Sequence, residues 1–163
     1  LHTKPFPTYV SDATTADVLS MIVYTSEATN QMVRNMSQRL AQSKKNGSLI
    51  IKSDYFWTSP LSGWQMPRTL SKEIAGTDLV ISKGDANYRR WLGDFQWPFD
   101  TPLLGILNYL PVPLLFLRVF KSNCLAGLEP GQQDKVEKND PDWLYNGQWG
   151  VIQTYFDSSH LGH

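Results

Sequence analysis

The sequence predicts an α/β fold, and two observations carry the prediction. The chain has 163 residues, of which 41% are hydrophobic and 18% charged, so it can bury the core of one packed domain. Four short runs rich in β-branched and apolar residues, at 48–52, 78–82, 114–118 and 149–155, have strand character, and a helix-like stretch at 68–75 separates the first two. Strand, helix, strand order is typical of α/β architecture. We expect the first two runs to be buried parallel strands.

The first third of the chain is predicted to be helical. Residues 14–17 form a capping-box pattern of threonine, two residues and an acid just before an apolar run, so a helix should begin there. Met32, Met36 and Leu40 then recur at four-residue spacing, and the stop signal Asn46-Gly47 follows. A second helix, or a continuation of the first, should therefore run to about residue 45, with the methionines in the core.

Three further segments have recognisable character. Residues 54–64 combine aromatic and turn residues, which predicts a structured loop. Residues 129–142 are polar and are predicted to lie at the surface. Residues 103–119 are the most apolar stretch, but Asn108, Pro111 and Pro113 interrupt it, so we predict core rather than a membrane span.

Composition excludes several classes of function. Fifteen basic residues balance fifteen acidic ones, which leaves no broad positive field for nucleic acid. Cys124 is the single cysteine and no leader pattern opens the sequence, so we expect a reducing, cytoplasmic setting, with further sequence preceding residue 1. The Walker loop, the Gly-x-Ser-x-Gly elbow, the dinucleotide glycine motif and the Cys-x-x-Cys pair are absent. His160 and His163 are more typical of a terminal tail than of a metal site.

The most informative segment follows the run at 78–82, where Lys83-Gly84-Asp85-Ala86-Asn87 leads into a predicted helix. Ligands of open α/β sheets bind at the carboxyl ends of strands, where a helix N-terminus attracts anions. Gly84 allows close backbone approach, Lys83 adds charge, and Asp85 or Asn87 can offer oxygen to a metal or a sugar hydroxyl. The same pattern is equally typical of a polar turn in which Asp85 or Asn87 caps the helix and the following arginines are solvated.

Charged residues that suit a binding site also stand at two other predicted strand ends. Asp12 stands where a strand-like segment meets the first helix, and Arg118 and Lys121 follow the run at 114–118. Taken singly, Asp12 is typical of a helix cap and the two cations of a solvated surface. If the sheet is parallel, all these ends meet at one edge and place an acid for a divalent metal beside cations for phosphate.

The segment 83–94, Lys-Gly-Asp-Ala-Asn-Tyr-Arg-Arg-Trp-Leu-Gly-Asp, resembles the Lys-Gly-Asp-x-Asn-Tyr-Arg signature of the damage-control phosphatase family, also catalogued as domain of unknown function 89. That family includes proteins named acidic-residue methyltransferase. The resemblance extends in order over most of the chain, through residues 4–12, 51–60, 114–121 and 140–153.

The resemblance implies a Rossmann-like three-layer sandwich with a mostly parallel central sheet, of which residues 1–163 would form the C-terminal part. It implies a metal-dependent phosphatase, served by Mn²⁺, Co²⁺ or Ni²⁺ with Mg²⁺ possible, that acts on sugar phosphates such as fructose 1-phosphate or fructose 6-phosphate. Asp12 would be a catalytic metal ligand, and Lys121 would be catalytic and bind phosphate. The other substrate contacts would be Lys83, Gly84, Asp85, Ala86, Asn87 and Arg118.

Two departures from the family pattern matter. The subgroup's Arg-Thr-x-Lys motif is Arg118-Val119-Phe120-Lys121 here, so a hydroxyl near the phosphate is lost. The family's Asp-Asn pair, which supplies other metal ligands, lies upstream of the part that this chain matches. We therefore expect a second chain or an N-terminal fragment to complete the site. The alternative is an altered relative that binds a phosphorylated metabolite, or serves as a subunit, without turnover. Protein carboxyl methylation is a weaker alternative, because the usual glycine-rich S-adenosylmethionine loop is absent.

Overall fold

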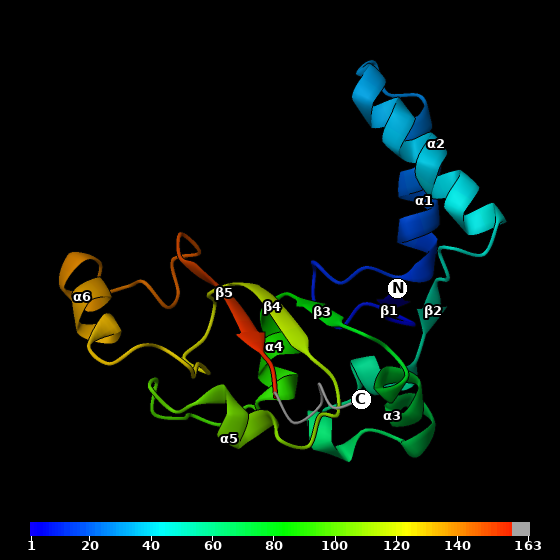
Figure 1. Ribbon diagram of the computed structural model, residues 1–163. Helices are drawn as coiled ribbons and strands as arrows, with labels where there is room; N and C mark the ends of the chain where they lie inside the picture. Colours follow the sequence, from blue (N-terminus) through cyan, green and yellow to red (C-terminus); the bar gives the residue numbers. More distant parts are fainter. Residues whose placement is uncertain (158–163) are drawn as a thin grey trace. The chain divides into compact units, whose positions relative to one another are not determined.

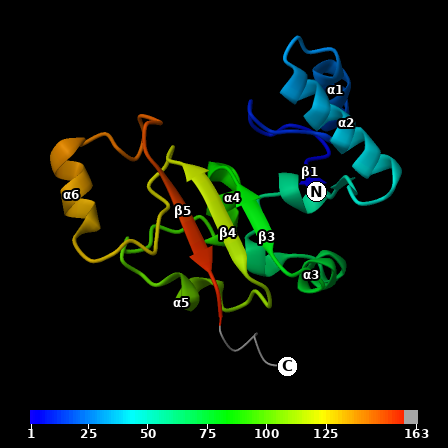
Figure 2. The ribbon, with the colours of Figure 1, turned by 45° about the horizontal axis from the view of Figure 1, so that its top comes forward.

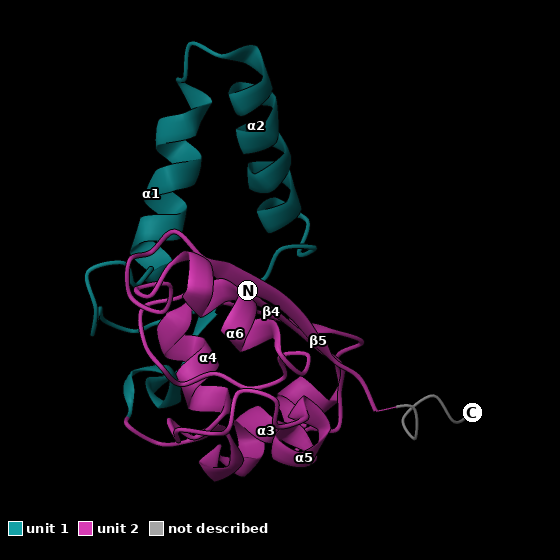
Figure 3. Ribbon diagram, turned by 90° about the vertical axis from the view of Figure 1, so that its left-hand side faces the viewer, with its two compact units in different colours: residues 1–59 teal, residues 60–163 magenta. Residues whose placement is uncertain are grey.

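The structure is a computed structural model that describes residues 1–157. The chain divides into two compact units, the first covering Leu1–Ser59 and the second beginning at Pro60 (Figure 3). Both contain helices and strands, so the predicted α/β class is confirmed. The strand pairs are partly parallel and partly antiparallel, and the mostly parallel three-layer sandwich stays a prediction.

The first unit is a helical hairpin joined to a small sheet. Its helices are α1 (Thr15–Ser26) and α2 (Gln31–Lys45), which pack against each other. Thr14 and Asp17 form the predicted capping box at the start of α1, with Thr14 N donating to Asp17 Oδ2 at 2.8 Å and Asp17 N to Thr14 Oγ1 at 3.2 Å. The predicted end of the second helix near residue 45 is also confirmed.

The methionines of α2 correct one prediction, because Met32 is 76% exposed and Met36 is 46% exposed. Val33 and Ser37 are less exposed, and each follows a methionine by one residue, so it is turned by about 100° around the helix, whereas Leu40 of the predicted series is itself half-buried. Ser37 is buried and its Oγ donates to the Ile22 carbonyl of α1 at 2.5 Å. The methionines therefore lie beside the packed face, not in it.

The small sheet of the first unit pairs β1 (His2–Thr3) with β2 (Lys52–Ser53) in parallel. The run at 48–52 was predicted to be a buried strand, yet only its last residue is in a strand and both residues of β2 are exposed. Because β1 is only two residues long, it pairs only with Lys52, the last residue of the run, and with Ser53 beyond it. The 3-10 helix η1 (Tyr55–Thr58) follows and buries Phe56 and Trp57.

The second unit is built on a three-stranded sheet of β3 (Val80–Lys83), β4 (Leu114–Val119) and β5 (Gly150–Tyr155), in that order (Figures 1 and 2). β3 and β4 are parallel, with Val80 opposite Leu114. β5 is antiparallel to β4, with Tyr155 opposite Leu114. The last three predicted strands are thus confirmed within two residues, but β3 is a partly exposed edge strand and pairs with β4, not with the earlier run.

The remaining elements of this unit are short. They are η2 (Gly63–Gln65), α3 (Arg68–Ala75), α4 (Asp85–Trp91), α5 (Leu103–Leu107) and α6 (Gln132–Asn139). α3 coincides with the predicted helix, and residues 54–64 form a structured loop, as expected. The apolar stretch 103–119 is core, with most of its large side chains buried. Among residues 1–157, the helices lack the combined length and hydropathy needed to cross a bilayer.

Candidate functional site

The carboxyl ends of β3 and β4 meet at one edge of the sheet in the second unit. The register places Lys83 opposite Leu117, and Gly84 N donates to the Leu117 carbonyl at 2.9 Å. The chain then turns at Gly84 into α4, which packs back on both strands. Because parallel strands end at the same edge, the segment 83–87 and the end of β4 come together there, as the sequence predicts.

A buried ion pair joins these two strand ends. Arg118 Nη2 lies 2.7 Å from Asp85 Oδ1, and Nε donates to the same oxygen at 2.8 Å. The Arg118 side chain is 0% exposed and the Asp85 side chain 11% exposed. A charged pair this far from water is held in place by its hydrogen bonds, because an unpaired buried charge is costly.

The rest of the Arg118 guanidinium holds the loop after β4. Nη1 donates to the Cys124 carbonyl, and Nη2 donates to the Ser122 carbonyl at 2.9 Å and to Ser122 Oγ at 3.0 Å. The group also lies over the Tyr88 ring at 4.3 Å. All three guanidinium nitrogens thus have protein acceptors. This geometry makes Arg118 a brace for the site, while its direct contact with substrate stays a prediction.

Burial around this brace shifts two neighbouring pKa values. Desolvation raises the pKa of Tyr88 to about 12, although hydrogen bonding to Ala126 and the charge of Arg118 act in the opposite direction. The Tyr88 hydroxyl lies 3.0 Å from Gln153 Oε1 of β5. Desolvation likewise raises the pKa of the Cys124 thiol to about 11. Both groups therefore stay neutral at pH 7, which suits packing roles and not acid–base chemistry.

The two lysines of the predicted site differ from Arg118 in being exposed. Lys83 ends β3, and Lys121 follows β4 between the buried Phe120 and the Arg118-bound Ser122. Among residues 1–157, neither lysine ammonium has a hydrogen bond or ion-pair partner. The backbone around each lysine is anchored while its charge remains available to an anion.

The turn between β3 and α4 explains the other predicted residues. Gly84 has φ 102° and ψ 157°, a conformation that is essentially restricted to glycine. Gly84 itself is the N-cap of α4, without a side-chain cap, so the alternative that Asp85 or Asn87 caps the helix is wrong. Asn87 Nδ2 donates to the Lys83 carbonyl at 2.8 Å, and Ala86 is half-buried in the first turn. α4 has only seven residues, so the lysines supply most of the positive charge.

The arginines of α4 are not simply solvated, as the alternative had them. Arg89 forms two hydrogen bonds to the Asp94 carboxylate, at 2.6 and 2.7 Å, and Arg90 Nη1 donates to the Leu61 carbonyl at 2.6 Å. Both therefore fix the end of α4. These hydrogen bonds give the two arginines a structural role and not a role in the strand-end site.

Asp12 belongs to the first unit and lies in a turn, so the strand-like segment predicted before it is wrong. Its Oδ2 accepts from Thr8 N at 2.9 Å, Thr8 Oγ1 at 2.7 Å and Tyr9 N at 2.9 Å, and lies 3.0 Å from Lys4 Nζ. Burial works to raise the pKa of Asp12, but the hydrogen bonds from Thr8, Tyr9 and Lys4 outweigh it and lower that pKa below its ordinary value. Asp12 is thus an ionised carboxylate at neutral pH.

Asp12 fits a metal only as one ligand of several. All its contacts in the described part of the chain use Oδ2, which leaves Oδ1 to offer a cation. Residues 1–157 contain no group of three or more His, Cys, Asp or Glu side chains able to hold a metal ion. A divalent cation takes about four to eight ligands. Its other ligands would have to come from elsewhere, and the meeting of Asp12 with the strand-end site stays a prediction.

Comparison with known proteins identifies the family of this chain. Residues 1–136 match the model of the damage-control phosphatase ARMT1-like domain. The chain belongs to the damage-control phosphatase ARMT1-like family. The residues matched by the family model include Asp12, the segment 83–87, Arg118 and Lys121.

Three relatives named "Damage-control phosphatase ARMT1" show the extent of the similarity. The Xenopus tropicalis protein is 33% identical over 156 residues, which cover 93% of this chain and 36% of that protein. The Danio rerio protein is 33% identical over 98% of this chain and 36% of its own length. The Homo sapiens protein is 30% identical over 92% of this chain and 35% of its own length. This member of the family therefore spans about a third of the length of the curated relatives it matches.

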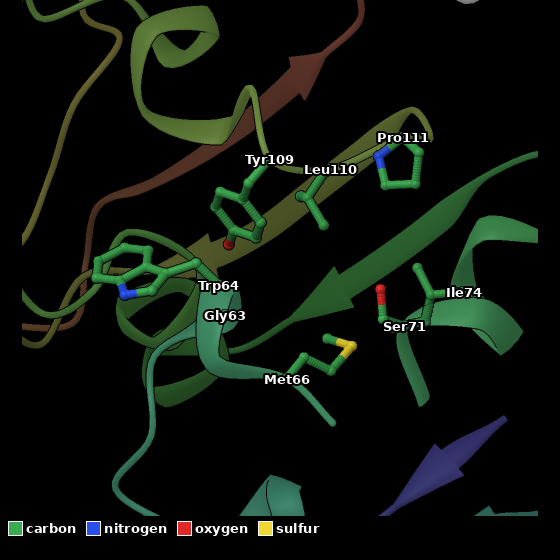
Figure 4. Close-up of a pocket in the computed structure, with 8 residues that line it drawn as sticks. All are labelled: Gly63, Trp64, Met66, Ser71, Ile74, Tyr109, Leu110 and Pro111. Carbon is green, nitrogen blue, oxygen red and sulfur yellow. The ribbon is translucent and has the colours of Figure 1, made fainter. Parts of the chain in front are cut away.

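A separate pocket of about 100 Å³ lies in the second unit of this ARMT1-like chain (Figure 4). It is lined by Gly63, Trp64, Met66, Ser71, Ile74, Tyr109, Leu110 and Pro111. Several of these residues lie in the segments that lead into β3 and β4, whereas the strand-end site follows those strands. The Tyr109 hydroxyl donates to the Trp91 carbonyl at 2.9 Å, and a Cβ on Gly63 would come within 2.1 Å of that hydroxyl. The pocket is thus a feature of packing around Tyr109.

Sequence reasoning missed two parts of the strand-end site. Ser122 completes the bond network of Arg118 and also lies 3.3 Å from Asp85 Oδ1, but nothing in its spacing marks it. Gln153 of β5 reaches the Tyr88 hydroxyl from 65 residues away along the chain. The residues at 160 and 163, considered for metal binding, lie outside the described residues.

Proposed function

We propose that this chain supplies the phosphate-binding edge of a metal-dependent phosphatase that acts on sugar phosphates such as fructose 1-phosphate or fructose 6-phosphate. The supporting observation is that two exposed lysines, Lys83 at the end of β3 and Lys121 just after β4, stand at strand ends that a buried ion pair joins. Family membership supports the reaction class, since the relatives are named damage-control phosphatases. The complete domain would be a Rossmann-like three-layer sandwich in the cytoplasm.

The residues of the chain have distinct tasks in this proposal. Lys83 and Lys121 bind the phosphoryl oxygens and stabilise the charge that develops on them during transfer. Gly84 lets the backbone approach the substrate, with Asp85, Ala86 and Asn87 in the same turn as further contacts. Arg118 fixes the two loops by holding Asp85 and Ser122.

Asp12 would hold a divalent metal, Mn²⁺, Co²⁺, Ni²⁺ or Mg²⁺, which supplies Lewis-acid polarisation of the phosphoryl group when bound. Asp12 can do so because its lowered pKa keeps it ionised. The remaining ligands would come from a second chain or an N-terminal fragment, since residues 1–157 offer no group of three or more His, Cys, Asp or Glu side chains able to hold a metal ion.

Phosphate release from fructose 1-phosphate with added Mn²⁺, Co²⁺ or Ni²⁺ tests the proposal, on this chain alone and together with the unmatched remainder of the Xenopus tropicalis relative. We expect activity only in the pair, and a loss of at least 100-fold with Lys121→Ala, because one positive charge on the transferred group is removed. Lys138→Ala, an exposed lysine of α6, is the control and should leave the rate unchanged. Absence of release in every arrangement would contradict the proposal.

A second candidate is a protein that binds a phosphorylated metabolite without turnover. Val119 favours it, because the family's hydroxyl is lost at a position that is 50% exposed and, by strand alternation, on the same sheet face as Lys83. Isothermal titration with fructose 6-phosphate separates the candidates. Binding with no phosphate release, in the pair and with metal, would support this second reading.

A further inference from the structure

The loop after β4 carries Lys121 and is held by side chains from other parts of the second unit. Residues 120–128 lie in neither a helix nor a strand, and Cys124, Leu125 and Ala126 among them are buried. A buried backbone carbonyl outside regular secondary structure needs a hydrogen-bond donor from elsewhere, because an unpaired one is costly. The side chains that donate to this loop therefore decide where its backbone lies.

Two side chains from neighbouring strands each bind two carbonyls of this loop. Arg118 of β4 binds two near its start, as part of the brace described above. Gln153 of β5 binds two near its end, because its Nε2 donates to the Ala126 carbonyl at 2.8 Å and to the Gly127 carbonyl at 3.2 Å. Gln153 stands opposite Phe116, two residues before Arg118, so both side chains lie on the same face of the sheet. The contacts of Gln153 with the loop are called the β5 clamp here.

Tyr88 of α4 connects the Arg118 brace to the β5 clamp. Its ring lies against the guanidinium, with 4.3 Å between Arg118 Cζ and the ring centroid. Its hydroxyl donates to Gln153 Oε1 at 3.0 Å and accepts from Ala126 N at 3.3 Å. Carbonyl oxygens can only accept, so the Gln153 amide has one usable orientation, with Nε2 toward the loop and Oε1 toward Tyr88. Both ends of the loop are thus tied to one fully buried tyrosine.

The backbone of the loop is shaped to let the glutamine come this close. Gly127 has φ 73°, in the left-handed region that favours glycine. A Cβ added there would lie 3.1 Å from Gln153 Nε2 and 2.8 Å from Leu103 Cγ. A side chain at this residue would therefore push against the clamp, and the glycine leaves the carbonyl open to Gln153.

We propose that Gln153 is a positioning residue for phosphate binding, because the β5 clamp holds the loop that presents Lys121. Gln153 acts through the loop and not by touching the phosphate. The proposal rests on the proposed function in taking Lys121 to bind phosphate. A binding group that is displaced by about 1 Å loses much of its effect. Lys83 should be unaffected, since it ends β3 and does not belong to the loop.

Amide hydrogen exchange of the chain tests the clamp. Gln153→Leu removes both donors, so we expect the amides of residues 122–127 to exchange at least tenfold faster than in the wild type. Gln153→Glu keeps the size of the side chain but cannot donate to a carbonyl, so it should act in the same way. Tyr88→Phe keeps the ring against Arg118 and should give a smaller increase. Gln148→Leu, an exposed glutamine in the turn before β5, is the control and should change nothing in the loop.

The pattern of exchange along the chain decides the outcome. Faster exchange confined to the loop in either Gln153 variant supports the clamp. Unchanged exchange of the loop would overturn the proposal, because other contacts would then hold it. An equal increase throughout the second unit would also overturn it, since Gln153 would then stabilise the whole fold and not the loop.

Titration with inorganic phosphate tests whether the clamp acts through Lys121. We expect Gln153→Leu to weaken phosphate binding at least fivefold in the wild type and in Lys83→Ala, but less than twofold in Lys121→Ala. Such coupling is expected of residues that act as a unit, whereas independent effects add. A merely structural loss would weaken binding equally in all three backgrounds and would overturn the proposal.

The two measurements separate the positioning proposal from the proposed function. If phosphate binds no more tightly to the wild type than to Lys121→Ala, the result counts against phosphate binding by Lys121. The exchange experiment still decides the clamp in that case, because it needs no ligand. If Lys121 does bind phosphate but Gln153→Leu weakens binding less than twofold in the wild type, the positioning proposal alone is overturned.

Discussion

Two of the ion pairs among the residues that the sequence singles out are similarly buried but differ in reach, with side-chain exposures of 8% and 10% for Lys4 and Asp12 and of 0% and 11% for Arg118 and Asp85. Lys4 and Asp12 are eight residues apart, and hydrogen bonds from Thr8 and Tyr9 make Asp12 the anchor of one local turn. Asp85 and Arg118 are 33 residues apart and join the start of α4 to the end of β4. The first pair stabilises a loop, while the second holds together the two strand ends on which the candidate site is built.

The difference predicts unequal consequences when each pair is broken. An arginine that is 0% exposed leaves a buried carboxylate and several carbonyls without partners when it is removed. A turn aspartate leaves backbone N–H groups that water can reach more easily. The four predictions below test this contrast.

Arg118→Met should have the largest effect on stability. The substitution keeps most of the side-chain volume but leaves Asp85 unpaired, so we expect the free energy of unfolding to fall by about 3–5 kcal/mol. Urea denaturation followed by circular dichroism measures it. Arg89→Met is the control, because its pair with Asp94 is 32% and 55% exposed and should matter by less than about 1 kcal/mol. Equal losses in the two variants would show that burial of the Arg118 pair is unimportant.

Gly84→Ala should lower the free energy of unfolding by about 1–3 kcal/mol, because alanine strains the backbone at this position. An added Cβ meets no atom within 4 Å, so the cost comes from φ 102° and not from a clash. Gly105→Ala, in α5 and also without neighbours within 4 Å of an added Cβ, should be neutral or slightly stabilising. Thermal melting of both variants measures the difference in stability. If Gly84→Ala is as stable as the wild type, the turn can relax to accept a side chain.

Asp12→Asn should change how stability depends on pH. The pKa of Asp12 is lower in the folded chain than its ordinary value of 3.8, so its ionised form stabilises the fold above about pH 4, and this contribution disappears as the pH falls through the folded pKa. We expect a loss of about 1–2 kcal/mol at pH 7 and a smaller difference between variant and wild type near pH 3. Denaturation midpoints at the two pH values measure it. A difference that does not shrink with acid would exclude this linkage.

Ser122→Ala should have the smallest effect. Its hydroxyl lies 3.0 Å from Arg118 Nη2 and 3.3 and 3.4 Å from the two Asp85 oxygens, which are long contacts to groups that keep other partners. We expect a loss of about 0.5–1 kcal/mol in unfolding free energy. A loss as large as that of Arg118→Met would place Ser122, and not the ion pair, at the centre of the brace.

Local signals decided much of what the sequence predicted correctly. The capping box of Thr14 and Asp17, the end of α2 near residue 45 and the helix at Arg68–Ala75 depend on contacts within a few residues. So does the strand-to-helix turn after Lys83, since its glycine and the helix that follows are read directly from the order of residues. The family that this turn's sequence resembles was confirmed by the match of residues 1–136 to the family model.

The errors have a common cause in tertiary packing. Met32 and Met36 repeat at a helical spacing, yet α1 packs one residue away, on the face of Ser37. The run at 48–52 has strand composition, but its only partner is the two-residue β1. Spacing specifies that a face exists, whereas the partner element decides which face is buried.

The sequence alone determined the mixed α/β class, the helix starts and stops, and the strand ends where Lys83, Asp85, Arg118 and Lys121 stand, because these follow from local propensity and chain order. Only the tertiary structure decided their separate tasks. Residues 33 apart in the chain meet when β3 and β4 pair in parallel, and that pairing buries Arg118 against Asp85 while it leaves both lysines in water. Burial and long-range contact are properties of the packed chain. No pattern along the sequence could therefore tell that Arg118 has a structural role while Lys83 and Lys121 remain exposed to bind an anion.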